Sequence, residues 1–258
     1  MTTSTPHAVL AGSGPEPDPE HHPPRHRRPT PAPLCALLGL VLLCGAALTA
    51  WADHRAAHRP PTAEAVYRRA GSLWRATPVD TLFPPVLAGP DAGPGGADRS
   101  WTRVALAPDA ECGPALAPAW QAALVPTGCT RVLRATYTDA TRSSLVTVGM
   151  VFTPADAPAM AALGGHFTAP PGYGFADGRR AAWTASVLPE GPIVLYTVSA
   201  FTDGRPVDAP RPAEEAMRKD ATGAVAQAGL GHEAKAVATA MERTLHTLTA
   251  PATPEPAR

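Results

Sequence analysis

The chain has 258 residues, and its 22 basic and 22 acidic side chains cancel to zero formal net charge. Proline (32 residues) and glycine (22 residues) make up about a fifth of the chain, nearly twice the ordinary share. This composition argues against one compact globule from end to end. The lack of a strongly basic segment argues against nucleic acid as a partner.

The first 33 residues form a tail rich in proline, histidine and hydroxyl side chains, and its acidic and basic residues balance. It holds almost no apolar clusters, so burial of side chains cannot offset the entropy of ordering it. We therefore expect residues 1–33 to be a disordered cytoplasmic tail.

An uncharged, apolar segment follows from Leu34 to Ala52. A helix of this length spans about 28 Å, which is close to the hydrocarbon thickness of a membrane. Trp51 lies at one end, where interfacial aromatic residues are common. The segment therefore predicts a transmembrane signal-anchor helix whose partner is the lipid bilayer.

A cleaved signal peptide is the alternative for this segment. Ala50-Trp51-Ala52 has the small-x-small pattern of a cleavage site, which would give a protein secreted after cleavage near Ala52. We favour the retained anchor because the apolar run is longer than the usual core of a signal peptide. Three arginines precede the segment and two follow it, so the positive-inside bias is slight. This bias favours an N-terminal tail inside the cell and a C-terminal domain outside the plasma membrane.

Residues 53–100 contain many turn-forming dipeptides, such as Pro84-Pro85 and Gly89-Pro90. We expect a Pro/Gly-rich linker here, with a short helix over residues 63–76. Ten of the 14 aromatic residues lie between Trp101 and Phe201, which places the core of the folded domain in that region.

The folded domain is predicted to be α+β over residues 101–249. Residues 101–107 alternate like a strand, and two further pairs of segments resemble hairpins, at 131–138 with 144–152 and at 181–188 with 193–201. These patterns predict a small, mostly antiparallel sheet of about five strands with packed helices. Helices are expected over residues 114–124, over residues 154–163 with Thr153 as N-cap, and from Pro212 onward.

The last helical segment carries an apolar stripe at helical spacing. We expect the stripe to pack on the sheet; its members are Ala234, Val237, Met241, Leu245 and Leu248. Residues 250–258 are predicted to be a disordered C-terminus.

Cys112 and Cys129 are the only cysteines outside the apolar segment. A bond between them would close a loop of about 18 residues, which is worth about 3 kcal/mol in the chain-entropy model. A metal or redox pair is the alternative, but CxxC spacing and nearby histidines are missing. The disulfide is favoured, and it indicates an oxidising compartment.

Catalytic motifs are not recognisable in the sequence, so we expect no enzyme and assign no catalytic, cofactor-binding or metal-binding residue. His232-Glu233 begins like the zinc motif H-E-x-x-H, but the second histidine is missing. The Gly/Pro-rich segment near residue 175 is the candidate partner-binding loop, because loops on a rigid sheet often bind partners. Its candidate residues are Tyr173, Phe175, Arg179 and Arg180. The alternative is that the two aromatic rings fill the edge of the core and that the two arginines belong to a solvated turn.

Four short segments carry a resemblance to a known group of proteins. They are E-C-G-P-A-L (111–116), G-C-T-R-V-L-R-A-T-Y (128–137), V-G-M-V-F (148–152) and F-A-D-G-R-R (175–180). In these segments the chain resembles uncharacterised actinobacterial single-pass membrane-anchored proteins with an extracytoplasmic α+β domain. The resemblance covers roughly residues 100–205 and implies no catalytic residues.

These observations favour a membrane-anchored extracytoplasmic binding or interaction module with a protein or cell-envelope partner. Two alternatives stay open at this stage. One is an extracytoplasmic hydrolase whose active site has no recognisable motif, and the other is an architectural subunit of a membrane complex. A pocket that joins a nucleophile, a base and an oxyanion site would favour the hydrolase.

Overall fold

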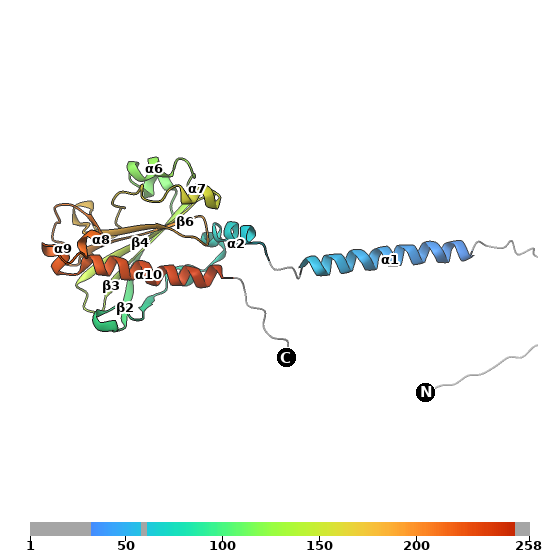
Figure 1. Cartoon of the computed structure of the whole chain (residues 1–258), viewed down its shortest axis with the longest axis horizontal. Helices are drawn as coiled ribbons and strands as arrows, with labels where there is room; N and C mark the ends of the chain where they lie inside the picture. Colours follow the sequence, from blue (N-terminus) through green and yellow to red (C-terminus); the bar gives the residue numbers. More distant parts are fainter. Residues whose placement is uncertain (1–31, 58–60, 251–258) are drawn as a thin grey trace, which may run out of the picture. The chain divides into compact units, whose positions relative to one another are not determined.

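A computed structural model describes residues 32–57 and 61–250 (Figure 1). The chain divides into two units, Met1–Arg59 and Pro60–Arg258. Residues 1–33 and 250–258 were predicted to be disordered. Apart from residues 32, 33 and 250, they lie outside the described part of the chain.

In the described part of the first unit, helix α1 (Ala32–Ala57) contains the apolar segment. Its stretch from Ala36 to Ala56 is long and apolar enough to cross a membrane, and none of that stretch is buried. Near its end, the guanidinium of Arg55 lies 3.7 Å from the centre of the Trp51 ring. The predicted apolar helix is confirmed, although it continues beyond residue 52.

The second unit is built on a seven-stranded sheet with the order β1-β2-β3-β4-β6-β5-β7. The strands are β1 (Val86–Gly89), β2 (Arg99–Leu106), β3 (Arg131–Asp139), β4 (Ser144–Phe152), β5 (Ala182–Val187), β6 (Ile193–Phe201) and β7 (Arg211–Pro212). Every neighbouring pair is antiparallel except β5 and β7. Both predicted hairpins are confirmed. The expected number of about five strands was too low, because β1 and β7 extend the sheet at its two edges.

Most of the helices in the second unit are short. They are α2 (Ala63–Ala70), α3 (Leu73–Ala76), α4 (Val79–Leu82), α5 (Cys112–Ala115), α6 (Pro118–Leu124), α7 (Ala157–Ala161), α8 (Ala213–Ala216), α9 (Ala224–Gln227) and α10 (Leu230–Thr249), with the 3-10 turns η1 (Pro94–Gly96) and η2 (Asp177–Arg179). The helix expected over residues 114–124 is divided in two, because Pro118 begins a new helix.

The expected N-cap at Thr153 was wrong. The carboxylate of Asp156 caps α7 instead, since its Oδ1 accepts a hydrogen bond from the main-chain N–H of Ala159 over 3.0 Å. The Thr153 hydroxyl contacts the Met160 sulfur and the Pro192 carbonyl, and it therefore joins α7 to the loop between β5 and β6.

The prediction of an irregular linker over residues 53–100 was also wrong, although the helix expected over residues 63–76 is present as the two short helices α2 and α3. Residues 53–57 belong to α1, and from residue 63 the chain forms α2, α3, α4, β1, η1 and the start of β2. The side chains of Leu82, Phe83 and Leu87 are buried in the main core. The prolines of this region stand at the ends of short elements, where they interrupt no hydrogen-bond ladder, and the apolar residues between them fill the core.

Helix α10 covers one face of the sheet and runs along the strands in Figure 1. Ala234, Val237, Met241 and Leu245 are buried, as the apolar stripe predicts, and Leu248 packs at the margin. The hydroxyl of Thr197, on the interior strand β6, donates to the main-chain carbonyl of Ala234 over 2.9 Å. Apolar packing and this hydrogen bond together fasten α10 to the sheet.

A second hydrophobic cluster covers the other face of the sheet, under α5, α6 and α7. Its centre is Trp120, whose ring stacks on Phe167 at 4.6 Å and lies 5.1 Å from Tyr196. Tyr196 in turn lies flat against Gly149, where a Cβ atom would approach its ring to 2.0 Å. Only glycine fits at position 149 with this ring in place.

Candidate functional site

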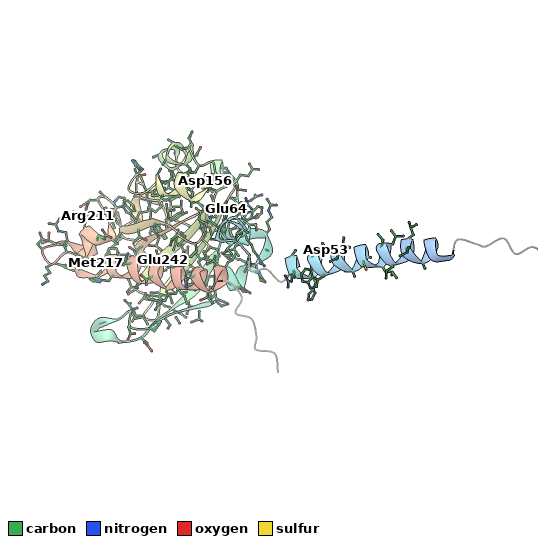
Figure 2. The ribbon with its side chains drawn as sticks, turned by 45° about the vertical axis from the view of Figure 1, so that its right-hand side comes forward. Asp53, Glu64, Asp156, Arg211, Met217 and Glu242 are labelled. Carbon is green, nitrogen blue, oxygen red and sulfur yellow. A yellow bond between two sulfur atoms is a disulfide. The ribbon has the colours of Figure 1, made fainter. Side chains whose placement is uncertain are left out.

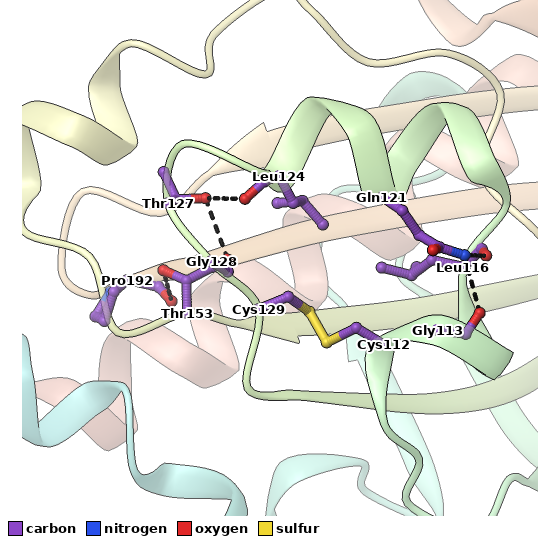
Figure 3. The surroundings of a disulfide bond; sticks show 10 residues. All are labelled: Cys112, Gly113, Leu116, Gln121, Leu124, Thr127, Gly128, Cys129, Thr153 and Pro192. Atoms are coloured by element: carbon purple, nitrogen blue, oxygen red, sulfur yellow. Dashed lines mark hydrogen bonds between the residues drawn. A yellow bond between two sulfur atoms is a disulfide. The ribbon is translucent and has the colours of Figure 1, made fainter.

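Cys112 and Cys129 form a disulfide bond with their Cα atoms 6.2 Å apart (Figure 3). The predicted pairing is confirmed. Nearby, the side-chain amide of Gln121 donates to the carbonyls of Gly113 and Leu116 over 3.0 and 2.8 Å. The disulfide and these hydrogen bonds hold α5 and α6 against the beginning of β3.

The candidate partner-binding loop is fastened to the sheet at Tyr173. Its main-chain N–H donates to the hydroxyl of Thr147 over 2.9 Å, and its carbonyl accepts from Thr136 over 2.6 Å. The guanidinium of Arg134 lies 5.3 Å from the centre of its ring. The main chain of Tyr173 therefore covers the hydroxyls of Thr136 and Thr147 on the sheet, and its ring is half-buried.

The other three predicted loop residues differ in their surroundings. Arg180 donates to the carbonyls of Ala169 and Pro170, both over 3.0 Å, so it stabilises the loop itself. Phe175 is half-buried against Gly172, whereas Arg179 is exposed. None of the four residues lines either of the two cavities described below, and their role in partner binding stays a prediction.

A groove of about 310 Å³ opens beside β5, between α10 and the segment that follows α7. Residues that line it include Phe167, Ala185, Ser186, Lys235, Ala238 and Glu242. A second cavity of about 540 Å³ also includes Glu242 and extends along α10 to His246. Glu242 is labelled on α10 in Figure 2. We call the two cavities together the β5 groove.

The floor of the β5 groove is an open strand edge. β5 pairs with β6 over residues 183–187, but on its other side β7 pairs only with Ala182 and Trp183. The N–H of Leu188 donates to the carbonyl of Ile193 on β6. In an antiparallel pair, every second residue directs its N–H and C=O toward the partner strand, and the residues between direct theirs away from it. The main-chain groups of Ala185 and Val187 therefore point away from β6 and have no backbone partner among the described residues.

Polar side chains of both charges stand along the walls of the β5 groove. The Ser186 hydroxyl donates to the Glu242 carboxylate over 2.9 Å, and His246 lies 3.0 Å from the carboxylate of Glu190. Lys235 is exposed and has no ion pair within residues 61–250. The groove therefore offers main-chain donors and acceptors together with charges of both signs, which suits a polar, extended ligand.

No sequence motif indicated the β5 groove. β5 was expected as one half of a hairpin with β6, and that pairing is correct. The second neighbour of β6 is β4, so β5 lies near the edge of the sheet. Only the absence of proline from residues 182–188 hints that this strand can accept another partner.

The His232-Glu233 pair occupies the first turn of α10. His232 is exposed, whereas Glu233 is buried and binds the indole of Trp101 and the guanidinium of Arg99. Within residues 32–57 and 61–250, no three His, Cys, Asp or Glu side chains gather as a metal-binding group. In the structure, Glu233 joins α10 to β2.

Comparison of the chain with protein-family models, with curated proteins and with solved structures finds no match. The resemblance to actinobacterial membrane-anchored proteins therefore stays a prediction. The proposal for the function therefore rests on the β5 groove and its open strand edge.

Proposed function

We propose that the protein is a membrane-anchored, extracytoplasmic binding module without enzymatic activity, which presents the β5 groove to a protein or cell-envelope partner. The observation that carries this proposal is the groove beside an open strand edge. Loops and edges held by a rigid scaffold are common binding sites, because the scaffold supplies the order that binding would otherwise cost.

Two features support the location. Helix α1 has the length and composition of a membrane span, and the Cys112–Cys129 disulfide is typical of an oxidising compartment. A retained α1 with the disulfide-bonded unit on the outer side agrees with both features. In this arrangement the groove is open to partners in the cell envelope.

Fractionation of cells and protease treatment of intact cells test the location. We expect the full chain in the membrane fraction and loss of the disulfide-bonded unit when protease is added outside. Release of a soluble chain that begins near Asp53 would show a cleaved signal peptide. Complete protection from external protease would place the unit inside the cell, and either result would overturn the proposal.

Site-specific photocrosslinking in intact cells tests the binding surface. A photoreactive amino acid at Lys235 stands in the β5 groove, and the same amino acid at Thr102 stands on β2, three strands away from β6. We expect a discrete protein or envelope adduct from position 235 and none of the same mass from position 102. Equal adducts from both positions, or none from position 235, would contradict a binding role for the groove.

A further inference from the structure

We infer that the ligand of the β5 groove is an extended polypeptide segment of a partner protein, which joins the sheet as an additional strand beside β5. This inference rests on the proposed function and names its ligand class. It follows from three features: the main-chain groups at the floor of the groove, the two walls, and the contrast with the opposite edge of the sheet.

The main-chain groups at the floor match those of a strand. Ala185 and Val187 each direct one N–H and one C=O away from β6. Because the two residues lie two positions apart in an extended strand, their outward groups are separated by about 6.8 Å. The main-chain groups of a neighbouring strand repeat with the same spacing. A bound segment can therefore form up to about four main-chain hydrogen bonds with β5.

The walls of the groove suit the alternating side chains of such a segment. On one side stands Phe167, with an apolar ring, and on the other stands α10, where the small Ala238 lies between Lys235 and Glu242. Successive side chains of a strand point to opposite faces. The bound segment should thus place apolar residues toward Phe167 and polar residues toward α10.

The opposite edge of the sheet is protected in a way that β5 is not. β1 has only four residues, and Pro85 and Pro90 flank it directly. Short edge strands with neighbouring prolines discourage the addition of a further strand. β5 has six residues and no proline, and β7 covers only its first two.

The recessed position of β5 favours a partner's extended segment over a second copy of this chain. In a second copy the β5 edge lies equally deep between α10 and the segment that contains Phe167. Two edges that are both recessed cannot approach to the 4.7–4.9 Å, approximately, that separates paired strands. A single extended segment can enter the groove without this conflict.

The first test uses a known probe. A phage-displayed library of random peptides is selected against the full, oxidised chain in lipid nanodiscs, and amide hydrogen exchange is followed with and without an enriched peptide. We expect the peptide to slow exchange about tenfold or more at the N–H groups of Ala185 and Val187. A bound peptide that leaves both amides unchanged would overturn the inference. So would strong protection of both amides before peptide is added, because another part of the chain or a second copy would then occupy the edge.

The second test uses a matched pair of variants. Ala185→Pro removes an outward N–H from β5, and Ala88→Pro removes an outward N–H from β1. The N–H of Arg103 donates to the carbonyl of Pro85, so by alternation the main-chain groups of residue 88 point away from β2. We expect Ala185→Pro to weaken peptide binding about tenfold or more and Ala88→Pro to leave the Kd unchanged. Equal weakening by both variants would contradict strand addition.

Two controls separate the possible failures. Thermal melting shows whether Ala185→Pro still folds, and if it does not, the exchange experiment on the unaltered chain decides. A crosslinked partner at position 235 together with unprotected amides would leave the binding module standing and exclude strand addition. Absence of both would contradict the module as well.

Discussion

The indole N–H of Trp101 donates to the Oε2 atom of Glu233 over 2.8 Å, although the two residues lie 132 positions apart in the chain. The other carboxylate oxygen forms an ion pair with Arg99. Trp101 and Glu233 are both buried. This pair connects β2, near one edge of the sheet, with the first turn of α10, and it thereby sets where α10 begins on the sheet.

Replacement of Glu233 by alanine should destabilise the domain. The change leaves the buried Trp101 indole and the partly buried Arg99 guanidinium without their acceptor, which costs about 3 kcal/mol. Glu233→Gln keeps an acceptor but loses the charge, so its effect should be smaller. Urea unfolding followed by tryptophan fluorescence measures the difference. Glu214→Ala, at an exposed site, is the matched control, and a Glu233→Ala variant as stable as this control would contradict the assignment.

Asp139 should make the stability depend on pH in the acid range. Burial raises the pKa of its carboxyl, but hydrogen bonds from Thr141, Ser144 and Ser143 outweigh burial and lower the pKa to about 2, from 3.8. A pKa that is lower in the folded state stabilises the fold above the unfolded pKa, and this contribution disappears as the pH falls from about 4 to about 2. The expected loss is about 1–2 kcal/mol, because the turn lies near the surface and solvent screens part of it.

Urea unfolding at a series of pH values tests this prediction. Asp139→Asn should be less stable than the unaltered chain at pH 7, and the difference should shrink toward pH 2. Asp208→Asn, at an exposed position, is the control and should leave the pH profile unaltered. A constant difference between Asp139→Asn and the unaltered chain across this range would disprove the role of the carboxylate.

Removal of the disulfide should lower the free energy of unfolding by about 3 kcal/mol, because the unfolded chain gains the freedom of the open loop. The variant is Cys112→Ser together with Cys129→Ser, and the control is Cys44→Ser, since Cys44 is a free, exposed thiol. Reductant should destabilise the unaltered chain and the control but not the double variant. A reductant effect on the double variant would show that the stability depends on another disulfide.

Gly149→Ala should destabilise the second core cluster. The added Cβ atom would lie 2.0 Å from the Tyr196 ring, so the ring or the strand must move, at a cost of about 2 kcal/mol or more. Gly113→Ala is the matched control, because no atom lies within 4 Å of the corresponding Cβ position. Thermal unfolding compares the two variants, and equal midpoints would show that the contact is not tight in solution.

Elements with a regular local pattern were predictable from the sequence. The strands β3 and β4 and the apolar stripe of α10 were found because their side chains repeat with the period of the element. The long apolar run of α1 and the pairing of Cys112 with Cys129 likewise needed only composition and spacing. These features depend on neighbours in the chain.

Residues 78–100 and the candidate site could not be predicted in this way. Prolines near Leu82, Phe83 and Leu87 made the region resemble a linker, yet these side chains complete the core under α10. The groove exists because β6 pairs with β4 as well as β5, so that β5 is left beside the short β7. Whether a strand is central or at an edge depends on contacts between residues far apart in the chain. The local periodicity of side chains does not depend on those contacts and therefore cannot predict them.

The proline and glycine content of the chain has a different meaning in its different parts. From composition alone it excluded a single globule, and the division of the chain into two units agrees with this. Local sequence was sufficient for α1, because an apolar helix satisfies its own main-chain groups and needs no partner within the chain. Only the tertiary structure decided which proline-rich segment joins the core and which strand edge stays open, because burial and strand pairing are settled by the whole fold at once.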